Sequence, residues 1–117
     1  SGYAFNAGGG DGNGTPIMVG PGATLDIVRG FNAGYSRLLN IAGGTLLITH
    51  SEGAPANDGG NYMNNLVLAD GAQVTGNRVR VGNFSAATIA VNGTTASTLA
   101  AGINMVVAGG LPLTLNV

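Results

Sequence analysis

The chain has 117 residues and few charges: 4 Arg, no Lys, 4 Asp, 1 Glu and 1 His, with a formal net charge of −1. Nucleic acids and anionic membranes attract clustered cations, so both are poor partners for this composition. The absence of cysteine excludes disulfides, cysteine zinc sites and thiol catalysis. A mean hydropathy of +0.31 argues for a folded chain, because disordered chains are hydrophilic and highly charged.

No stretch reaches the roughly 18 apolar residues that predict a membrane-spanning helix. The longest candidate, residues 105–117, is interrupted by Gly109, Gly110 and Pro112. The start shows no basic and then apolar signal sequence, so we expect a mature or excised piece of a longer chain. Residues 1–117 are expected to form one domain, with a Gly-rich loop or linker over residues 1–15.

Short segments in which aliphatic residues alternate with polar or small ones recur along the whole chain. They cover residues 24–27, 39–41, 45–49, 66–68, 78–81, 88–92 and 113–117. A period of two predicts strands with one face inward, and no window carries a helical pattern. The residues expected to be buried are Leu25, Ile27, Leu46, Ile48, Val79, Val81, Ile89 and Val91.

Corners of small residues separate several of these strands. They fall at residues 22–23, 43–44, 71–72 and 109–110. Asp70-Gly71 and Asn92-Gly93 would also suit hairpin turns, so an antiparallel β-sandwich is the alternative. An irregular repeat of about 20 to 30 residues with Gly at its corners favours a parallel β-solenoid of roughly four to five rungs.

Two segments resemble the β-helical passenger regions of bacterial autotransporters and their associated β-strand repeats. The segment Gly-Gly-Thr-Leu-Leu-Ile at 43–48 resembles the recurring strand unit of that family. The segment 96–105, followed by Leu-Thr-Leu-Asn-Val at 113–117, resembles its second strand pattern. The resemblance implies export to the cell surface or medium, and a rod that serves reach, display or adhesion.

We therefore expect a non-catalytic structural or adhesive element of a secreted or cell-surface bacterial protein, without cofactors. Its expected partners are further copies, adjoining segments of the parent chain, glycans, or surface proteins of a host or neighbour. One alternative is a self-assembling extracellular filament subunit with end-to-end strand pairing. A second is a carbohydrate-binding or carbohydrate-active β-helix.

Catalysis on a β-helix needs several carboxylates gathered on one face. The five acids are scattered instead, and only Asp26, Glu52 and Asp70 stand near strands. His50 and Ser51 are adjacent on an extended chain, so their side chains point to opposite faces and cannot form a dyad. We expect no catalytic residue, and a solvated His50 at a corner.

Two Gly-rich loops offer oxygen donors that suit calcium, but each occurs once. The weak candidate ligands are Asp11 and Asn13 in the first loop, and Asn57 and Asp58 in the second. Because calcium affinity depends on the number of ligands, we expect no metal site and no requirement for calcium.

Two further features suggest contact surfaces. Phe31, Tyr35 and Tyr62 fall in loop regions, where aromatic rings can stack on sugars or proteins. The C-terminal segment carries Leu113, Leu115 and Val117 in strand alternation. A strand in this position exposes an unpaired edge, so we expect it to pair with another chain.

Overall fold

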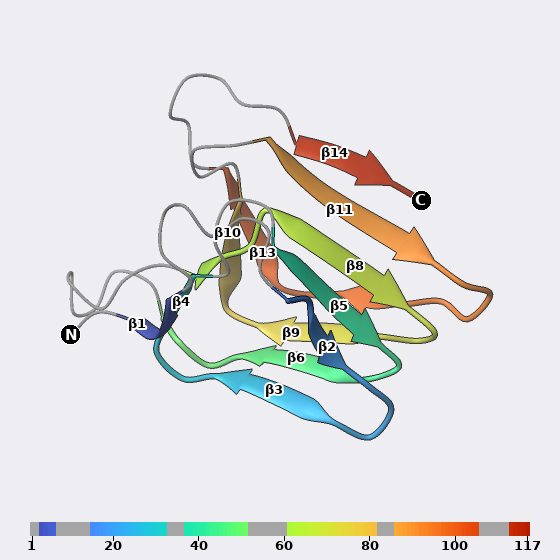
Figure 1. The fold of residues 1–117 in the computed structure, drawn as a ribbon, viewed down its shortest axis with the longest axis horizontal. Helices are drawn as coiled ribbons and strands as arrows, with labels where there is room; N and C mark the ends of the chain where they lie inside the picture. Colours follow the sequence, from blue (N-terminus) through green and yellow to red (C-terminus); the bar gives the residue numbers. More distant parts are fainter. Residues whose placement is uncertain (1–2, 7–14, 33–36, 52–60, 82–85, 106–112) are drawn as a thin grey trace.

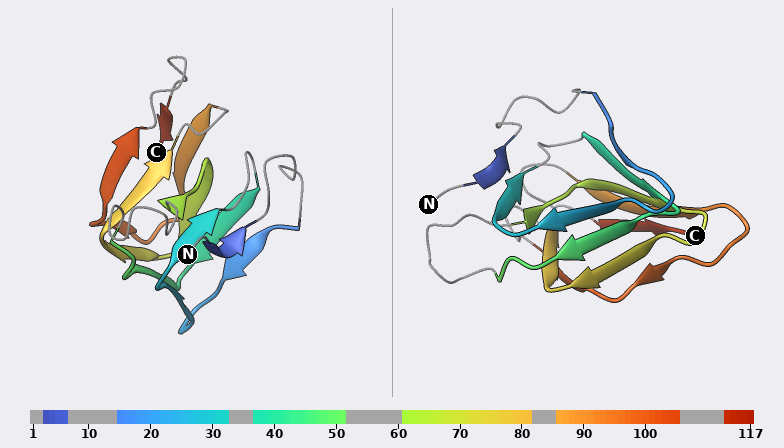
Figure 2. Two further views of the ribbon diagram at one scale, coloured as in Figure 1. Left: turned by 90° about the vertical axis from the view of Figure 1, so that its left-hand side faces the viewer. Right: turned by 90° about the horizontal axis from the view of Figure 1, so that it is seen from below.

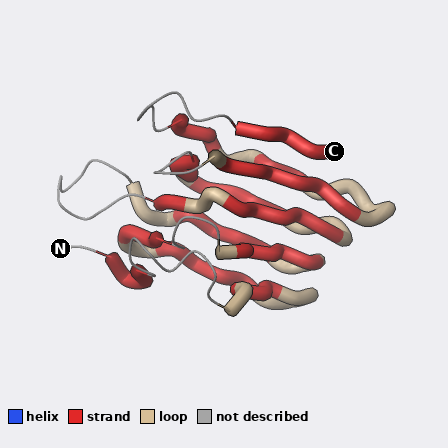
Figure 3. Tube along the Cα trace, turned by 45° about the horizontal axis from the view of Figure 1, so that its top comes forward, coloured by secondary structure: helices blue, strands red, loops and turns tan. Residues whose placement is uncertain are grey.

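The computed structural model contains fourteen short strands and no helix in its described part, which covers residues 3–6, 15–32, 37–51, 61–81, 86–105 and 113–117 (Figure 3). Accordingly, no helix in those residues is long and apolar enough to cross a membrane.

The strands form three sheets, which we name A, B and C. Sheet A contains β1 (Tyr3–Asn6), β4 (Gly30–Asn32), β7 (Asn61–Tyr62), β10 (Arg78–Val81) and β13 (Gly102–Met105). Sheet B contains β2 (Ile17–Val19), β5 (Leu38–Ala42), β8 (Asn65–Ala69), β11 (Ala87–Asn92) and β14 (Leu113–Asn116). Sheet C contains β3 (Thr24–Ile27), β6 (Thr45–Ile48), β9 (Gln73–Gly76) and β12 (Thr98–Leu99).

The chain visits sheets B, C and A in turn and then returns to B one position further along the stack. Four successive coils, β2–β3–β4, β5–β6–β7, β8–β9–β10 and β11–β12–β13, lie between β1 and β14. In each sheet the colours therefore run in chain order from blue to red (Figures 1 and 2). Every described strand pairing is parallel, which confirms the predicted β-solenoid and excludes the antiparallel sandwich.

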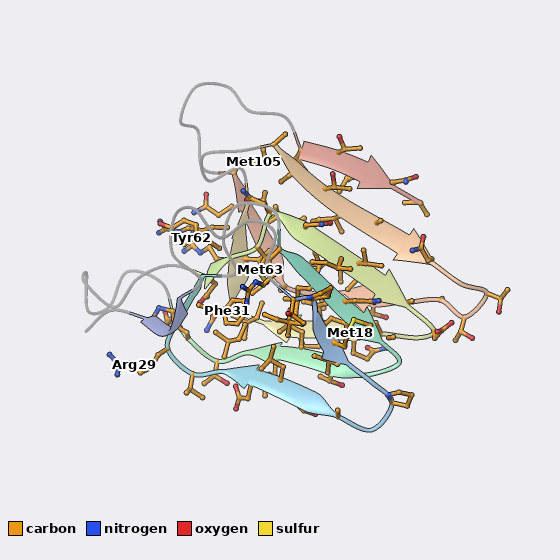
Figure 4. All side chains as sticks on the ribbon, viewed as in Figure 1. Met18, Arg29, Phe31, Tyr62, Met63 and Met105 are labelled. Atoms are coloured by element: carbon orange, nitrogen blue, oxygen red, sulfur yellow. The ribbon has the colours of Figure 1, made fainter. Side chains whose placement is uncertain are left out.

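One row of aliphatic side chains from each sheet points inward and stacks on the same row of the next coil. Leu25, Leu46 and Val74 form one such column in sheet C, because β3, β6 and β9 pair in register. All eight residues expected inside belong to this core or pack against it, with Leu25 and Val91 partly buried. Phe31 and Met63 also lie in the interior (Figure 4).

The corners between sheets B and C contain residues with positive φ. Gly22, Gly43 and Gly71 have φ angles of 74°, 75° and 80°, at three of the predicted corners. The fourth stacked corner follows β11 at Gly93, with φ 88°, so Asn92-Gly93 forms a bend between sheets B and C within one coil and no hairpin. The predicted corner at residues 109–110 lies outside the described residues.

The N-terminal segment differs from expectation. Residues 3–6 form β1, which pairs with β4, although residues 1–15 were expected to be a Gly-rich loop or linker. Tyr3, Ala4, Phe5 and Asn6 do show a period of two, but the glycines around them hid this strand in the sequence.

Gly76 ends β9 at the corner between sheets C and A, where its backbone lies close to the preceding coil. Its φ is +100°, and a Cβ at this position would collide with the backbone carbonyl of Ile48 in the preceding coil. The backbone N–H of Asn77 also donates a hydrogen bond to the Ile48 carbonyl, over 2.8 Å. Only glycine satisfies both the positive φ and the close contact between coils.

We predict that Gly76→Ala lowers the free energy of unfolding by more than about 2 kcal/mol, because the methyl group forces two coils apart. The control is Gly22→Ala, at φ +74° with open space around the new Cβ, which should cost only about 1 kcal/mol. Urea denaturation of the two variants measures both losses. Equal losses would show that backbone strain alone, and not coil packing, fixes Gly76.

Candidate functional site

The outer faces of the three sheets differ in chemistry, because outward residues do not contribute to coil stacking. Sheet B mixes apolar and asparagine side chains on its outer face, since Met18 and Val67 share one outward column with Asn40, and sheet C carries a threonine-rich row. The outward residues of β7, β10 and β13 in sheet A are Tyr62, Arg78, Arg80, Gly102 and Asn104. We call this set the arginine face, and it is the candidate site.

Tyr62 and Arg80 lie side by side on adjacent coils of the arginine face. The two residues are partners in the parallel register of β7 and β10. Arg80 Nη1 donates a hydrogen bond to the Tyr62 hydroxyl over 3.3 Å, and its guanidinium carbon lies 5.7 Å from the ring centroid. Both contacts restrict the Arg80 side chain, which is therefore oriented before any ligand arrives.

Arg78 lies two residues before Arg80 on β10, so both point outward while Val79 and Val81 are fully buried. The register partner of Arg78 in the next coil is Gly102. Gly102 has no side chain to cover the arginine, and the Asn104 amide lies beside Arg80 in register. The arginine face thus offers two guanidinium groups, one phenol and one amide.

Asn61 supports this face from inside the solenoid. It precedes Tyr62 on β7, points inward and is fully buried. Its Nδ2 atom donates to the Arg78 carbonyl over 3.2 Å and to the His50 carbonyl over 3.5 Å. The Asn61 amide therefore ties the short strand β7 to the start of β10, and so fixes Tyr62 relative to Arg78 and Arg80.

Charges are segregated in the described part of the chain. Arg78 and Arg80 lie on sheet A, and Arg29 directly precedes β4 and points away from the core (Figure 4). Arg37 directly precedes β5 of sheet B. The described acids lie elsewhere: Asp26 on β3 in sheet C, and Asp70 at a corner between sheets B and C. The arginine face is consequently the place where two of the four described arginines lie on the same strand, away from the described acids.

The acids that sequence analysis placed near strands are not brought together. Asp26 belongs to the first coil, where its Oδ1 accepts a hydrogen bond from the Thr49 hydroxyl over 2.7 Å. Asp70 belongs to the third coil. Its φ of 56° is part of the turn that joins sheet B to sheet C. Glu52 lies outside the described residues.

The sequence prediction for His50 was wrong: its side chain is 4% exposed, not solvated. The strand alternation continues past the end of β6, so Ile48 points inward, Thr49 outward and His50 inward again. The His50 amide donates to the Ile27 carbonyl over 2.8 Å, which extends the pairing between coils beyond the strand itself.

The aromatic contact candidates separate in the structure. Tyr62 lies on the arginine face, whereas Phe31 is 5% exposed and belongs to the core. Phe31 is therefore unavailable as a surface contact, because β4 directs it inward. Tyr35 lies outside the described residues. The alternation in the sequence already predicted that Arg78 and Arg80 point outward, but it did not indicate that Arg80 contacts Tyr62.

The calcium candidates Asp11, Asn13, Asn57 and Asp58 lie outside the described residues. Within the described part, no group of three or more His, Cys, Asp or Glu side chains could hold a metal ion.

A cavity of about 300 Å³ opens at the first coil. Its lining is mostly apolar and includes Ile17 of β2, Leu25 and Ile27 of β3, and Phe31 of β4. These side chains belong to the inward rows, and β2 and β3 are the edge strands of their sheets. Among the described residues, the cavity therefore lies at the edge of the core next to β2 and β3.

Comparison with protein-family models, curated proteins and solved structures finds no match to this chain.

We predict that Asn61→Ala destabilises the protein by about 2 kcal/mol or more, because it leaves inward-facing carbonyls of two coils without their donor. The control is Asn77→Ala, at an exposed side chain that donates to the Thr49 carbonyl over 3.0 Å. Water can replace that bond, so this variant should cost less than about 1 kcal/mol. Thermal and urea unfolding compare the two, and a smaller loss for Asn61→Ala would contradict its role as the anchor of β7.

Proposed function

We propose that this protein is a non-catalytic structural element, a rod segment of a secreted or cell-surface bacterial protein. The observation that carries the proposal is the chemistry of the C-terminal end of the stack, which β12, β13 and β14 form. Its inward row keeps the apolar pattern of the interior although no described strand covers it.

Register pairs between consecutive coils make the comparison direct. Val79 is fully buried, whereas its partner Ile103 in the last coil is 39% exposed. Ile89 is 3% exposed, whereas its partner Leu115 on β14 is 62% exposed. Burying such side chains is worth about 1.5 to 3 kcal/mol each, so this end favours a further coil stacked upon it.

A rod that is extended by further coils repeats the spacing between coils along its length. Such a structural role requires no reactive side chain. The resemblance of segments 43–48 and 96–105 to autotransporter repeats supports an exported bacterial setting. For an exported rod, the useful properties are the length of the rod and the outer surfaces that it exposes. Adhesion is then a property of particular outer faces.

We predict that the rod accepts an added coil. Residues 65–87 make up one coil, because Thr88 takes the register position beside Asn65. Inserting a second copy of 65–87 before Thr88 should lengthen the particle by about 4.8 Å, the strand spacing, with the melting temperature retained or raised. Small-angle scattering and thermal unfolding measure both effects.

Failure of this insertion variant to fold would overturn the rod proposal. The non-catalytic part has its own test, a screen of the wild-type protein for depolymerisation of polysaccharides. Turnover that Asp26→Asn or Asp70→Asn abolishes, with the fold unchanged, would show that the protein is an enzyme.

End-to-end self-assembly is a second candidate function, favoured by the two open ends. Strands β12, β13 and β14 are edge strands at one end, and β1, β2 and β3 are edge strands at the other. A second copy whose first coil stacks on the last coil of its neighbour would cover both the exposed row and the apolar cavity. Such head-to-tail contacts produce open filaments.

We predict that Leu115→Lys suppresses this association, because it places a charge in the row that the next copy must bury. The control is Thr114→Lys, since Thr114 is exposed and points outward on the same strand. Sedimentation should show concentration-dependent growth for the wild type and Thr114→Lys, and monomers for Leu115→Lys. A wild type that stays monomeric at high micromolar concentration would exclude self-assembly.

A further inference from the structure

We propose that the arginine face binds a carboxylated glycan, a sugar chain that bears uronate groups. Arg78 and Arg80 would hold the carboxylates, and Tyr62 and Asn104 would hydrogen-bond to the sugar hydroxyls. This inference goes beyond the structural role, because that role does not depend on which side chains the outer faces carry.

The first argument is the preorganisation of Arg80. The hydrogen bond and the ring contact with Tyr62 hold its guanidinium group on the face. The interior Asn61 fixes Tyr62 in turn, by tying β7 to the start of β10. A side chain that is already oriented loses less conformational entropy when a ligand binds, and a planar guanidinium can take a carboxylate through two parallel hydrogen bonds.

The second argument is spacing. Arg78 and Arg80 point to the same side of β10, so roughly 6.6 Å separates them along the strand. Gly102 beside Arg78 adds no side chain that would block access, since a Cβ there would stand 3.4 Å from the Arg78 Cβ. One carboxylate can therefore bind at each arginine, or one guanidinium can take a carboxylate while the other contacts a hydroxyl of the next sugar.

The third argument separates a glycan from other anionic partners. The outward residues of the arginine face include no aliphatic side chain, whereas protein interfaces have an apolar centre. Nucleic acids bind through many phosphate contacts, and this chain has four arginines and no lysine. A sparsely charged polymer rich in hydroxyl groups fits a face of two arginines, a phenol and an amide.

The experiment titrates the ¹⁵N-labelled full chain with three probes: an oligogalacturonate, its methyl ester and an oligothymidylate. The ester keeps the sugar and removes the charge, while the oligothymidylate carries its charge on phosphates and has neither uronate carboxylates nor the ring hydroxyl groups of a glycan. We expect amide shifts on β7, β10 and β13 with oligogalacturonate, and binding to the other two probes that is weaker by about tenfold or more, the value of a charged hydrogen bond.

The variants Arg80→Gln and Arg78→Gln should each weaken oligogalacturonate binding about tenfold. Tyr62→Phe keeps the ring and removes the hydroxyl, so it should weaken binding less than Arg80→Gln. The matched control is Arg29→Gln, which removes the same charge from an exposed arginine outside the face, with a change below about twofold. Circular dichroism and melting temperature verify the fold of each variant.

Three results would overturn the proposal. The first is no binding of oligogalacturonate at millimolar concentration by the folded wild type. The second is equal binding of oligothymidylate, which would indicate a general anion surface. The third is an equal loss of oligogalacturonate affinity for Arg29→Gln and Arg80→Gln, which would show that binding depends on net charge and not on the arginine face. None of these results bears on coil insertion, so the structural role is tested separately.

Discussion

The stacking of each coil on the previous one, in parallel register, is the constraint on which the whole structure depends. Each coil contributes one inward aliphatic row and a set of backbone hydrogen bonds to its neighbour. Columns such as Leu39, Leu66 and Ile89 in sheet B result from this register. Because every coil contacts only its neighbours, stability is gained locally and repeatedly, without a thick central core.

The corners decide whether this stacking can continue. At a corner the alternation of strand residues breaks, and backbone carbonyls turn toward the next coil. At Gly76 the absence of a side chain lets the backbone lie against the Ile48 carbonyl of the preceding coil. Asn61 instead places a side-chain amide inside the stack, where it donates to the Arg78 carbonyl. Backbone hydrogen bonds pair the coils again where the next strands begin. The Thr45 N–H donates to the Ala23 carbonyl over 2.9 Å, and the Thr98 N–H donates to the Ala72 carbonyl over 2.8 Å.

This division between interior and exterior leaves the outer faces available for function. The inward rows are held to apolar residues by stacking, while the outward residues can differ from sheet to sheet without loss of core. Sheet B presents a mixture of apolar and asparagine side chains, and sheet A presents Tyr62, Arg78 and Arg80. One chain can therefore combine a structural role along its axis with recognition on one of its sides.

The sequence by itself determined the strands with a clear aliphatic alternation, such as β3, β6 and β10, their inward aliphatic residues and the parallel solenoid class, because a period of two and small-residue corners are local patterns. The alternation of Arg78, Val79, Arg80 and Val81 already assigned each side chain to a face. The burial of His50, the interior position of Asn61 and the contact between Tyr62 and Arg80 arose only in the tertiary structure. They depend on which residues of different coils share a register, and the unequal lengths of the connecting loops conceal that register in the sequence.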